Sequence, residues 1–134
     1  MKSISKLKKE LDKWFSLFIR LRNATSEGLV QCITSGRTYH YKNIHAGHFI
    51  SRRHLATRWC ELNVSPQSAA DNLFGQGEQY KFGLALDNKY GEGTAAELQY
   101  KSRQTIKMSR IDYEEKISYY KDLVEKLKKE KGIE

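Results

Sequence analysis

The sequence predicts a small α+β protein in which short β-hairpins and a helix are flanked by a long helix at each end. Apolar residues recur at helical spacing over residues 3–22 and again after Ser109, which predicts the two end helices. Between them, short strand-like runs are separated by glycines and by the single proline of the chain. A length of 134 residues predicts a single domain over residues 1–134.

The first predicted helix, residues 3–22, has one apolar face. The residues of this face recur three or four positions apart, and they are Leu7, Leu11, Trp14, Phe18 and Leu21, with Phe15 widening the stripe. The apolar face predicts that the helix docks on the core. Its lysines lie off the stripe, where they either face solvent or contact the backbone of DNA.

A first β-hairpin is predicted to follow this helix. Residues 29–34 and 37–41 have the composition of two short strands. Ser35-Gly36 lies between them, and glycine supplies the backbone freedom that a turn needs.

A second extended pair is predicted over residues 44–50 and 63–67, with residues 51–58 irregular or helical. On a regular strand, His45 and His48 point to opposite faces of the sheet. A site that uses both histidines therefore requires a bulge, which Gly47 would permit.

Helices are predicted for the rest of the chain, over residues 68–74, over residues 78–90 and from two later starts. Thr94 and Glu97 have the spacing of a capping box, and Ser109 with Asp112 resembles another. The last helix carries a heptad-like apolar seam, formed by Tyr113, Ile117, Tyr120, Val124 and Leu127. This seam either packs on the first helix or forms a contact in a homodimer.

The charge balance predicts an anionic partner. The net charge is +8, which favours nucleic acid first and an anionic membrane surface second. No apolar run is long enough for a membrane span, and the N-terminus lacks the apolar core of a signal peptide, so we expect no membrane. Two cysteines do not make a disulfide framework, which predicts a cytoplasmic protein.

Residues 45–54 hold three of the four histidines, His45, His48 and His54. They lie within residues 28–60, a window with five Lys or Arg and no Asp or Glu. The absence of carboxylates favours an anionic ligand, and imidazole is the side chain best suited to accept a proton near neutral pH. Together these features indicate chemistry on a phosphate group.

One stretch carries a family resemblance. The run Ala46-Gly47-His48-Phe49-Ile50-Ser51-Arg52-Arg53-His54, with the later Asn63-Val64, Pro66-Gln67 and Asn72-Leu73-Phe74, resembles the phage NinG (Rap) recombination proteins. The resemblance covers roughly residues 14–100. It implies an HNH-like, or ββα-metal, nuclease core over residues 29–80 and a helical C-terminal extension over residues 81–134.

The resemblance also implies roles for individual residues. His48 matches the histidine that acts as general base, Asn63 matches the asparagine that orients it, and Asn72 matches a ligand of one catalytic Mg²⁺ or Mn²⁺ ion. Because Gly47 stands where many such enzymes have a metal ligand, His45 is the best substitute, with His54 and Asp71 as further candidates. Phosphate contacts are expected from the basic residues that follow, Arg52, Arg53, His54 and Arg58.

The relatives carry paired Cys-x-x-Cys knuckles that hold a structural zinc ion. The corresponding positions here are Cys32 with Ser35 and Ser68 with Asp71, so one thiolate of four is present. Such a set lacks the donors of a closed zinc site. We therefore expect no structural zinc.

Taken together, the resemblance implies a metal-dependent, structure-specific DNA endonuclease that cleaves branched recombination intermediates such as Holliday junctions. It would act in the cytoplasm of a bacterial host as a phage or prophage protein, with a homodimer as the natural partner of a symmetric junction. Two alternatives stay open at this point. One is a degenerate nuclease that only binds DNA, and the other is a sequence-specific HNH nuclease.

Overall fold

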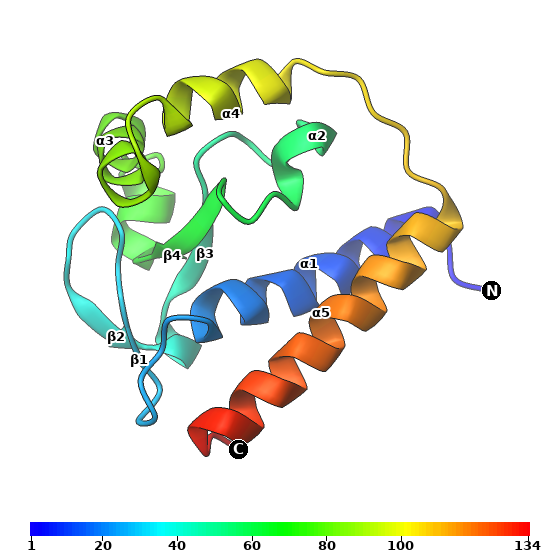
Figure 1. Ribbon diagram of the computed structural model, residues 1–134, viewed down its shortest axis with the longest axis horizontal. Coiled ribbons are helices and arrows are strands. Elements are labelled where there is room, and N and C mark those ends of the chain that lie inside the picture. Colours follow the sequence, from blue (N-terminus) through cyan, green and yellow to red (C-terminus); the bar gives the residue numbers. More distant parts are fainter.

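The computed structural model describes residues 1–134, and it combines helices with two small antiparallel sheets (Figure 1). The prediction of an α+β fold with long terminal helices is confirmed. The helices are α1 (Ile4–Leu21), α2 (Leu55–Arg58), α3 (Gln79–Tyr90), α4 (Thr94–Ser102) and α5 (Arg110–Lys131). The strands are β1 (Leu29–Gln31), β2 (Thr38–His40), β3 (His45–His48) and β4 (Val64–Gln67), and two short turns of helix cover Tyr41–Asn43 and Ala70–Phe74.

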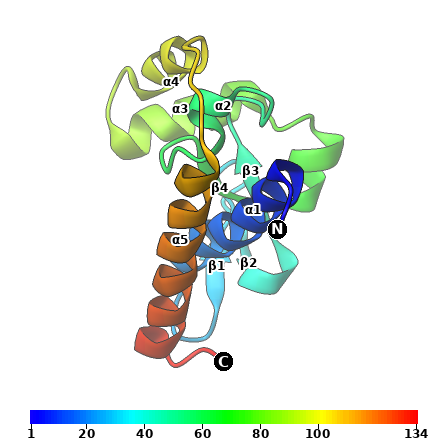
Figure 2. The same cartoon turned by 90° about the vertical axis from the view of Figure 1, so that its right-hand side faces the viewer.

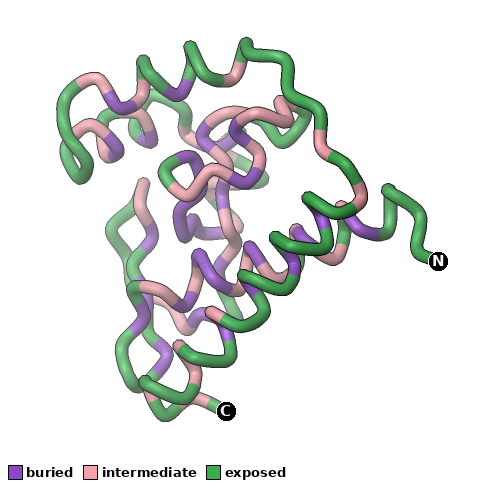
Figure 3. The backbone as a smooth tube through the Cα atoms, turned by 45° about the vertical axis from the view of Figure 1, so that its right-hand side comes forward, coloured by how far each residue is buried: buried purple, intermediate pink, exposed green.

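The two terminal helices cross and form the main core between them (Figures 1 and 2). Each starts at a serine whose side chain accepts a backbone N–H, Ser3 for α1 and Ser109 for α5, and the predicted capping box at Ser109 is present. Buried positions of both helices alternate with exposed ones along the tube in Figure 3. Helix formation and burial are thus coupled, as expected of amphipathic helices.

The seam of α5 packs on α1 of the same chain, as one of the two readings of the sequence predicted. Tyr120 lies edge-on to Phe15, with ring centroids 4.9 Å apart, and Tyr113 lies edge-on to Trp59 at 5.7 Å. Aromatic pairs in this geometry stabilise a core beyond the area that they bury. The seam residues Tyr113, Ile117, Tyr120 and Val124 are buried, and Leu127 packs against them.

The two sheets are hairpin-like pairs with regular register. β1 pairs with β2, and β3 pairs with β4 so that Gly47 lies opposite Ser65 and His48 opposite Val64. The bulge at Gly47 that a site using both His45 and His48 would require is therefore absent. Gly47 serves another purpose, because a Cβ atom there would collide with the side chain of the buried Gln67.

A smaller core lies between α3, α4 and the residue that follows β3. Its buried residues are Phe49, Phe82, Leu86 and Leu98. Helix α4 begins at Thr94 as predicted, but the predicted capping box of Thr94 and Glu97 is wrong, because the N-cap is Gly93. The backbone N–H of Ala95 instead donates to the carboxylate of Asp87 on α3, at 2.8 Å. A carboxylate from the neighbouring helix thus caps α4.

Between β4 and α3 the backbone adopts uncommon conformations. Residues Ala70–Phe74 form a π-helical turn, which we call the π turn, and such turns occur frequently at functional sites. Gln76 and Glu78 then have φ angles of 54° and 47°, a left-handed conformation that residues other than glycine rarely adopt. None of the helices combines the length and apolar character that crossing a bilayer requires.

Candidate functional site

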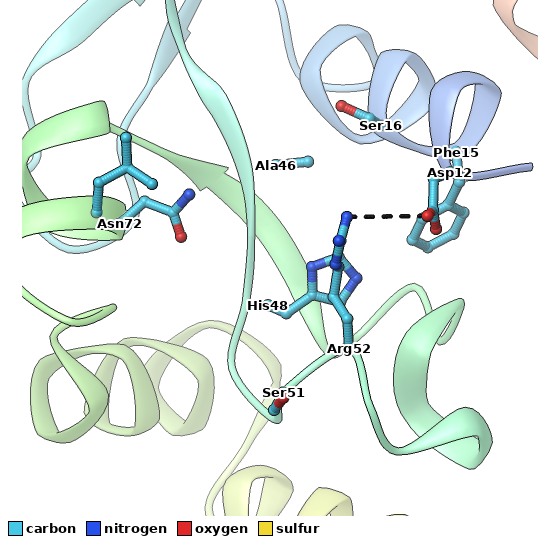
Figure 4. Close-up of a pocket in the computed structure, with 9 residues that line it drawn as sticks. Asp12, Phe15, Ser16, Ala46, His48, Ser51, Arg52 and Asn72 are labelled. Carbon is cyan, nitrogen blue, oxygen red and sulfur yellow. Dashed lines mark ion pairs between the residues drawn. The ribbon is translucent and has the colours of Figure 1, made fainter. Parts of the chain in front are cut away.

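A hollow of about 430 Å³ opens between α1, β3 and the π turn (Figure 4). Helix α1 supplies Asp12, Phe15 and Ser16 to its lining. Strand β3 supplies Ala46 and His48, the turn after β3 supplies Ser51 and Arg52, and the π turn supplies Asn72 and Leu73. Two of the three HNH-type residues predicted from the sequence, His48 and Asn72, line this hollow.

His48 is held in one tautomer. Its Nε2 atom lies 2.9 Å from the carbonyl oxygen of Arg58, and a carbonyl can only accept a hydrogen bond. Nε2 therefore carries the proton, and Nδ1 keeps its lone pair. Burial lowers the pKa of His48 below its ordinary value of 6.5, and the positive charges of Arg52 and Arg58 act in the same direction. At neutral pH the ring is an uncharged imidazole that can accept a proton at Nδ1.

Asp12 is a lining residue that sequence reasoning missed. Its carboxylate accepts hydrogen bonds from Nη2 of Arg58 at 2.6 Å and from the indole N–H of Trp59 at 2.9 Å. Arg52 lies 3.8 Å from the same carboxylate, the ion pair drawn in Figure 4. Because the partners are separated by more than forty positions in the chain, no local pattern marks Asp12. Its role is to fix Arg58, whose carbonyl in turn holds His48.

The four residues predicted to contact phosphate differ in how free their side chains are to do so. Arg58 is committed to Asp12, and its guanidinium also lies over the ring of Trp59, 4.8 Å from the centroid. His54 stands at the N-cap of α2, beyond the end of β3, so the alternation that would place it beside His48 does not extend to it. Arg52 lines the hollow, has 62% of its side chain exposed and makes only a long ion pair with Asp12, so it can also contact an anion there. Arg53 is exposed but does not line the hollow.

Asn63 is completely buried and holds the turn that follows β3. Its Oδ1 accepts the N–H of Ile50 at 2.8 Å, and its Nδ2 donates to the carbonyls of Ile50 and Thr57 at 3.1 and 3.0 Å. These bonds tie the segment that carries Arg52 to the start of β4. Asn63 therefore has the geometry of a positioning residue, because its side chain is enclosed by protein.

His45 and Asn72 contact each other. Nδ2 of Asn72 donates to Nδ1 of His45 at 3.0 Å, which leaves Oδ1 of Asn72 without a partner in this pair. His45 does not line the hollow, since the regular register of β3 directs it to the other face of the strand. The structure thus brings His48 and Asn72 to one hollow, and His45 is connected to that hollow only by its hydrogen bond with Asn72.

A catalytic divalent ion fits at Asn72 only as an ion shared with a substrate. No group of three His, Cys, Asp or Glu side chains lies close enough together to hold a metal. Asp12, the one carboxylate that lines the hollow, is occupied by Arg58 and Trp59. Mg²⁺ prefers oxygen ligands and commonly completes its shell with water and phosphate oxygens, to which the free Oδ1 of Asn72 would add one protein ligand.

The four positions that the resemblance matched to a zinc site, Cys32, Ser35, Ser68 and Asp71, do come together, but they are joined by hydrogen bonds. The Cys32 sulfur accepts the backbone N–H groups of Ser35 and Ser68, at 3.4 and 3.2 Å, and the Thr34 hydroxyl donates to Asp71 at 2.6 Å. Burial raises the pKa of the Cys32 thiol, but these hydrogen bonds outweigh it and lower the pKa to about 7. One sulfur with hydroxyl and carboxylate neighbours does not fit a closed structural zinc site.

Comparison with known proteins agrees with this picture of the chain. The family model described as Bacteriophage Lambda NinG protein matches residues 1–130. The chain belongs to the NinG family. NinG membership makes it a phage protein related to recombination. Searches of curated proteins and of solved structures found no match.

The NinG match covers both terminal helices as well as the strands between them. The crossing of α1 and α5 therefore belongs to the matched region rather than to an unrelated extension. Since α1 contributes Asp12, Phe15 and Ser16 to the hollow, the site and the helical frame of this NinG chain form one unit.

Proposed function

We propose that this NinG-family protein is a metal-dependent, structure-specific DNA endonuclease that hydrolyses phosphodiester bonds in branched recombination intermediates such as Holliday junctions. One observation carries the proposal: His48 is a neutral imidazole, with its proton held at Nε2 by the Arg58 carbonyl, in an open hollow beside an exposed arginine. A purely structural histidine needs neither an open cavity beside its ring nor a solvent-exposed guanidinium next to it.

The order of elements supports the same reading. The pair β3–β4 is followed directly by the π turn, which brings Asn72 to the hollow that His48 lines. This is the hairpin-then-helix order that the HNH, or ββα-metal, class would use. In that class a hairpin and a helix hold one histidine and one ion against a phosphate.

The proposed mechanism is a general-base hydrolysis. Nδ1 of His48 takes a proton from the attacking water, while the Arg58 carbonyl keeps the ring oriented. The water oxygen bonds to phosphorus as the P–O bond to one sugar oxygen breaks, and that leaving oxygen takes up a proton from solvent. Arg52 and Arg53 bind non-bridging or neighbouring phosphate oxygens through guanidinium hydrogen bonds. A Mg²⁺ or Mn²⁺ ion held by Asn72 and the substrate, when bound, supplies positive charge that stabilises the phosphorane-like transition state.

A second candidate function is DNA binding without cleavage. One observation favours it: the only carboxylate at the hollow is engaged by two arginines and is not free to ligate a metal. In that case the hollow would serve as an anion-binding site, and His48 would contribute a hydrogen bond rather than a base.

A nicking assay separates the two functions. Purified protein is incubated with four-way-junction DNA and with linear duplex, each with Mg²⁺, Mn²⁺ or EDTA, and His48→Ala is compared with wild type. We expect metal-dependent nicking of the junction that His48→Ala reduces by at least about a hundredfold, the size of a general-base contribution, with junction affinity retained. His40→Ala, a histidine on β2 that does not line the hollow and is not among the predicted DNA contacts, is the matched control and should cut normally. Equal residual cutting by wild type and His48→Ala would refute the role of His48.

A further inference from the structure

The hollow around His48 continues beyond the proposed cleavage site. A second hollow of about 310 Å³ shares His48, Ser51 and Asn72 with the first. A third, of about 340 Å³, shares Phe49 and Gln79 with the second. Neighbouring hollows thus share lining residues, and we call the series of three, from α1 past His48 to the face where α3 meets α4, the trough.

We propose that this trough holds unpaired nucleotides of the DNA strand next to the cleaved phosphate, and that Tyr80 stacks on one of their bases. The inference rests on the proposed function, since it deepens that function by naming what part of a branched substrate the protein contacts. An unpaired base exposes the face of its ring, whereas a base inside a duplex is already stacked on both sides.

Tyr80 provides a platform for such a base. Its side chain is 80% exposed, in the first turn of α3, and it has no aromatic or hydrogen-bonding partner in the protein. Leu84 lies one helical turn later, is also exposed, and lines the same hollow. Exposed aromatic residues beside a groove are the usual means by which proteins bind single strands, because every base offers a face for stacking.

The polar lining of the trough suits the edges of bases rather than a cation. The second and third hollows contain no Asp or Glu; their polar side chains beyond the proposed cleavage site are the amides Gln76, Gln79 and Gln99. A glutamine amide both donates and accepts hydrogen bonds, as the exposed edges of unpaired bases require. The net charge of +8 favours the strand's phosphates over an acidic peptide.

The backbone along the trough is held in an unfavourable shape. Gln76 and Glu78 both have left-handed φ angles, a strained conformation for residues other than glycine. A hydrogen bond from a buried side chain helps to maintain this conformation, since Nε2 of Gln67 donates to the carbonyl of Gly77 at 2.8 Å. Strain of this kind persists where the surrounding structure fixes it, and the segment that it shapes borders both Asn72 and Gln79.

The test compares forked DNA with duplex DNA of the same length and sequence at the junction point. The fork carries 2-aminopurine in its unpaired arm, and the measurements are made with EDTA so that nothing is cut. For wild type we expect tighter binding to the fork and quenching of the 2-aminopurine fluorescence by stacking. Tyr80→Ala should weaken fork binding by about tenfold and abolish the quenching, with duplex affinity unchanged. Tyr80→Trp should preserve both.

The matched control is Tyr119→Ala, a tyrosine on α5 that is 56% exposed and lies outside the trough. It should bind the fork as wild type does. If Tyr80→Ala binds the fork normally, or if Tyr119→Ala loses as much affinity, the inference is wrong, and a protein segment becomes the better occupant of the trough. Fork binding that depends on Tyr80 without any metal-dependent nicking would overturn the proposed nuclease and leave the inference standing; nicking that depends on His48 but not on Tyr80 would do the reverse.

Discussion

Asp12→Asn is the substitution that best tests how α1 is joined to the segment that positions His48. The Asp12 carboxylate accepts two hydrogen bonds from Arg58, at 2.6 and 3.2 Å, and one from Trp59 at 2.9 Å. An asparagine of the same shape keeps one acceptor oxygen but turns an N–H₂ group toward the Arg58 guanidinium. Hydrogen bonds to charged groups are worth about 1.5–3 kcal/mol when buried. Since about a fifth of each side chain is exposed, 21% and 16%, we expect a loss near the lower end, about 2 kcal/mol.

This loss is measurable by thermal unfolding. At roughly 2.1 cal/mol/K per residue, unfolding 134 residues has an entropy of about 0.28 kcal/mol/K, so 2 kcal/mol lowers Tm by about 7 °C. The matched control is Glu10→Gln on the same helix, which removes the more exposed ion pair of Lys2 and Glu10 and should lower Tm by about 2 °C or less. An Asp12→Asn protein that melts with wild type, or no earlier than Glu10→Gln, would show that the anchor contributes little.

Three further predictions follow from the same contacts. Cleavage should fall as the pH drops, with its midpoint below 6.5, because burial lowers the pKa of His48 and the base stays neutral down to that lowered pKa; a pH–rate profile with its midpoint at or above 6.5 would contradict this. Gly47→Ala should destabilise the protein by about 1–3 kcal/mol in urea unfolding, because its Cβ meets Gln67; in the double variant with Gln67→Ala the losses should be less than additive, and strict additivity would exclude the clash. Treatment with a zinc chelator should leave Tm unchanged, and elemental analysis should find no zinc in wild type or in Cys32→Ser; one equivalent of zinc in wild type would refute the hydrogen-bonded arrangement.

The sequence predicted most of the features that depend on residues close together in the chain, although the capping box expected at Thr94 and Glu97 is absent. The apolar stripe of the first helix and the Ser109 capping box depend on residues three or four positions apart, and both predictions are confirmed. The apolar seam from Tyr113 to Val124 predicts a contact face, either for the first helix or for a second copy of the chain. In the structure the seam packs on α1, a long-range contact. Secondary structure and the main core could therefore be predicted from periodicity.

Contacts between distant segments were not predictable in the same way. From the sequence, Gly47 is notable only as a position that would permit a bulge, whereas in the structure it makes room for the buried Gln67 on the opposite strand. No local sequence pattern marks Asp12, because its role depends on its hydrogen bonds with the distant Arg58 and Trp59. Arg58 had been grouped with the phosphate-binding residues because it lies in a basic window, and only the fold reveals that its charge is already balanced by a carboxylate.

The pairing of α1 with α5 has a consequence for how the protein is made. A ribosome completes α1 early, but Phe15 and Trp59 lack their aromatic partners until Tyr120 and Tyr113 have been translated. Until then α1 keeps its contacts with β3 and β4, but the apolar face that α5 covers in the finished protein is exposed to solvent. The main core, and with it the final position of the α1 residues that line the hollow, is therefore complete only after α5 has been synthesised.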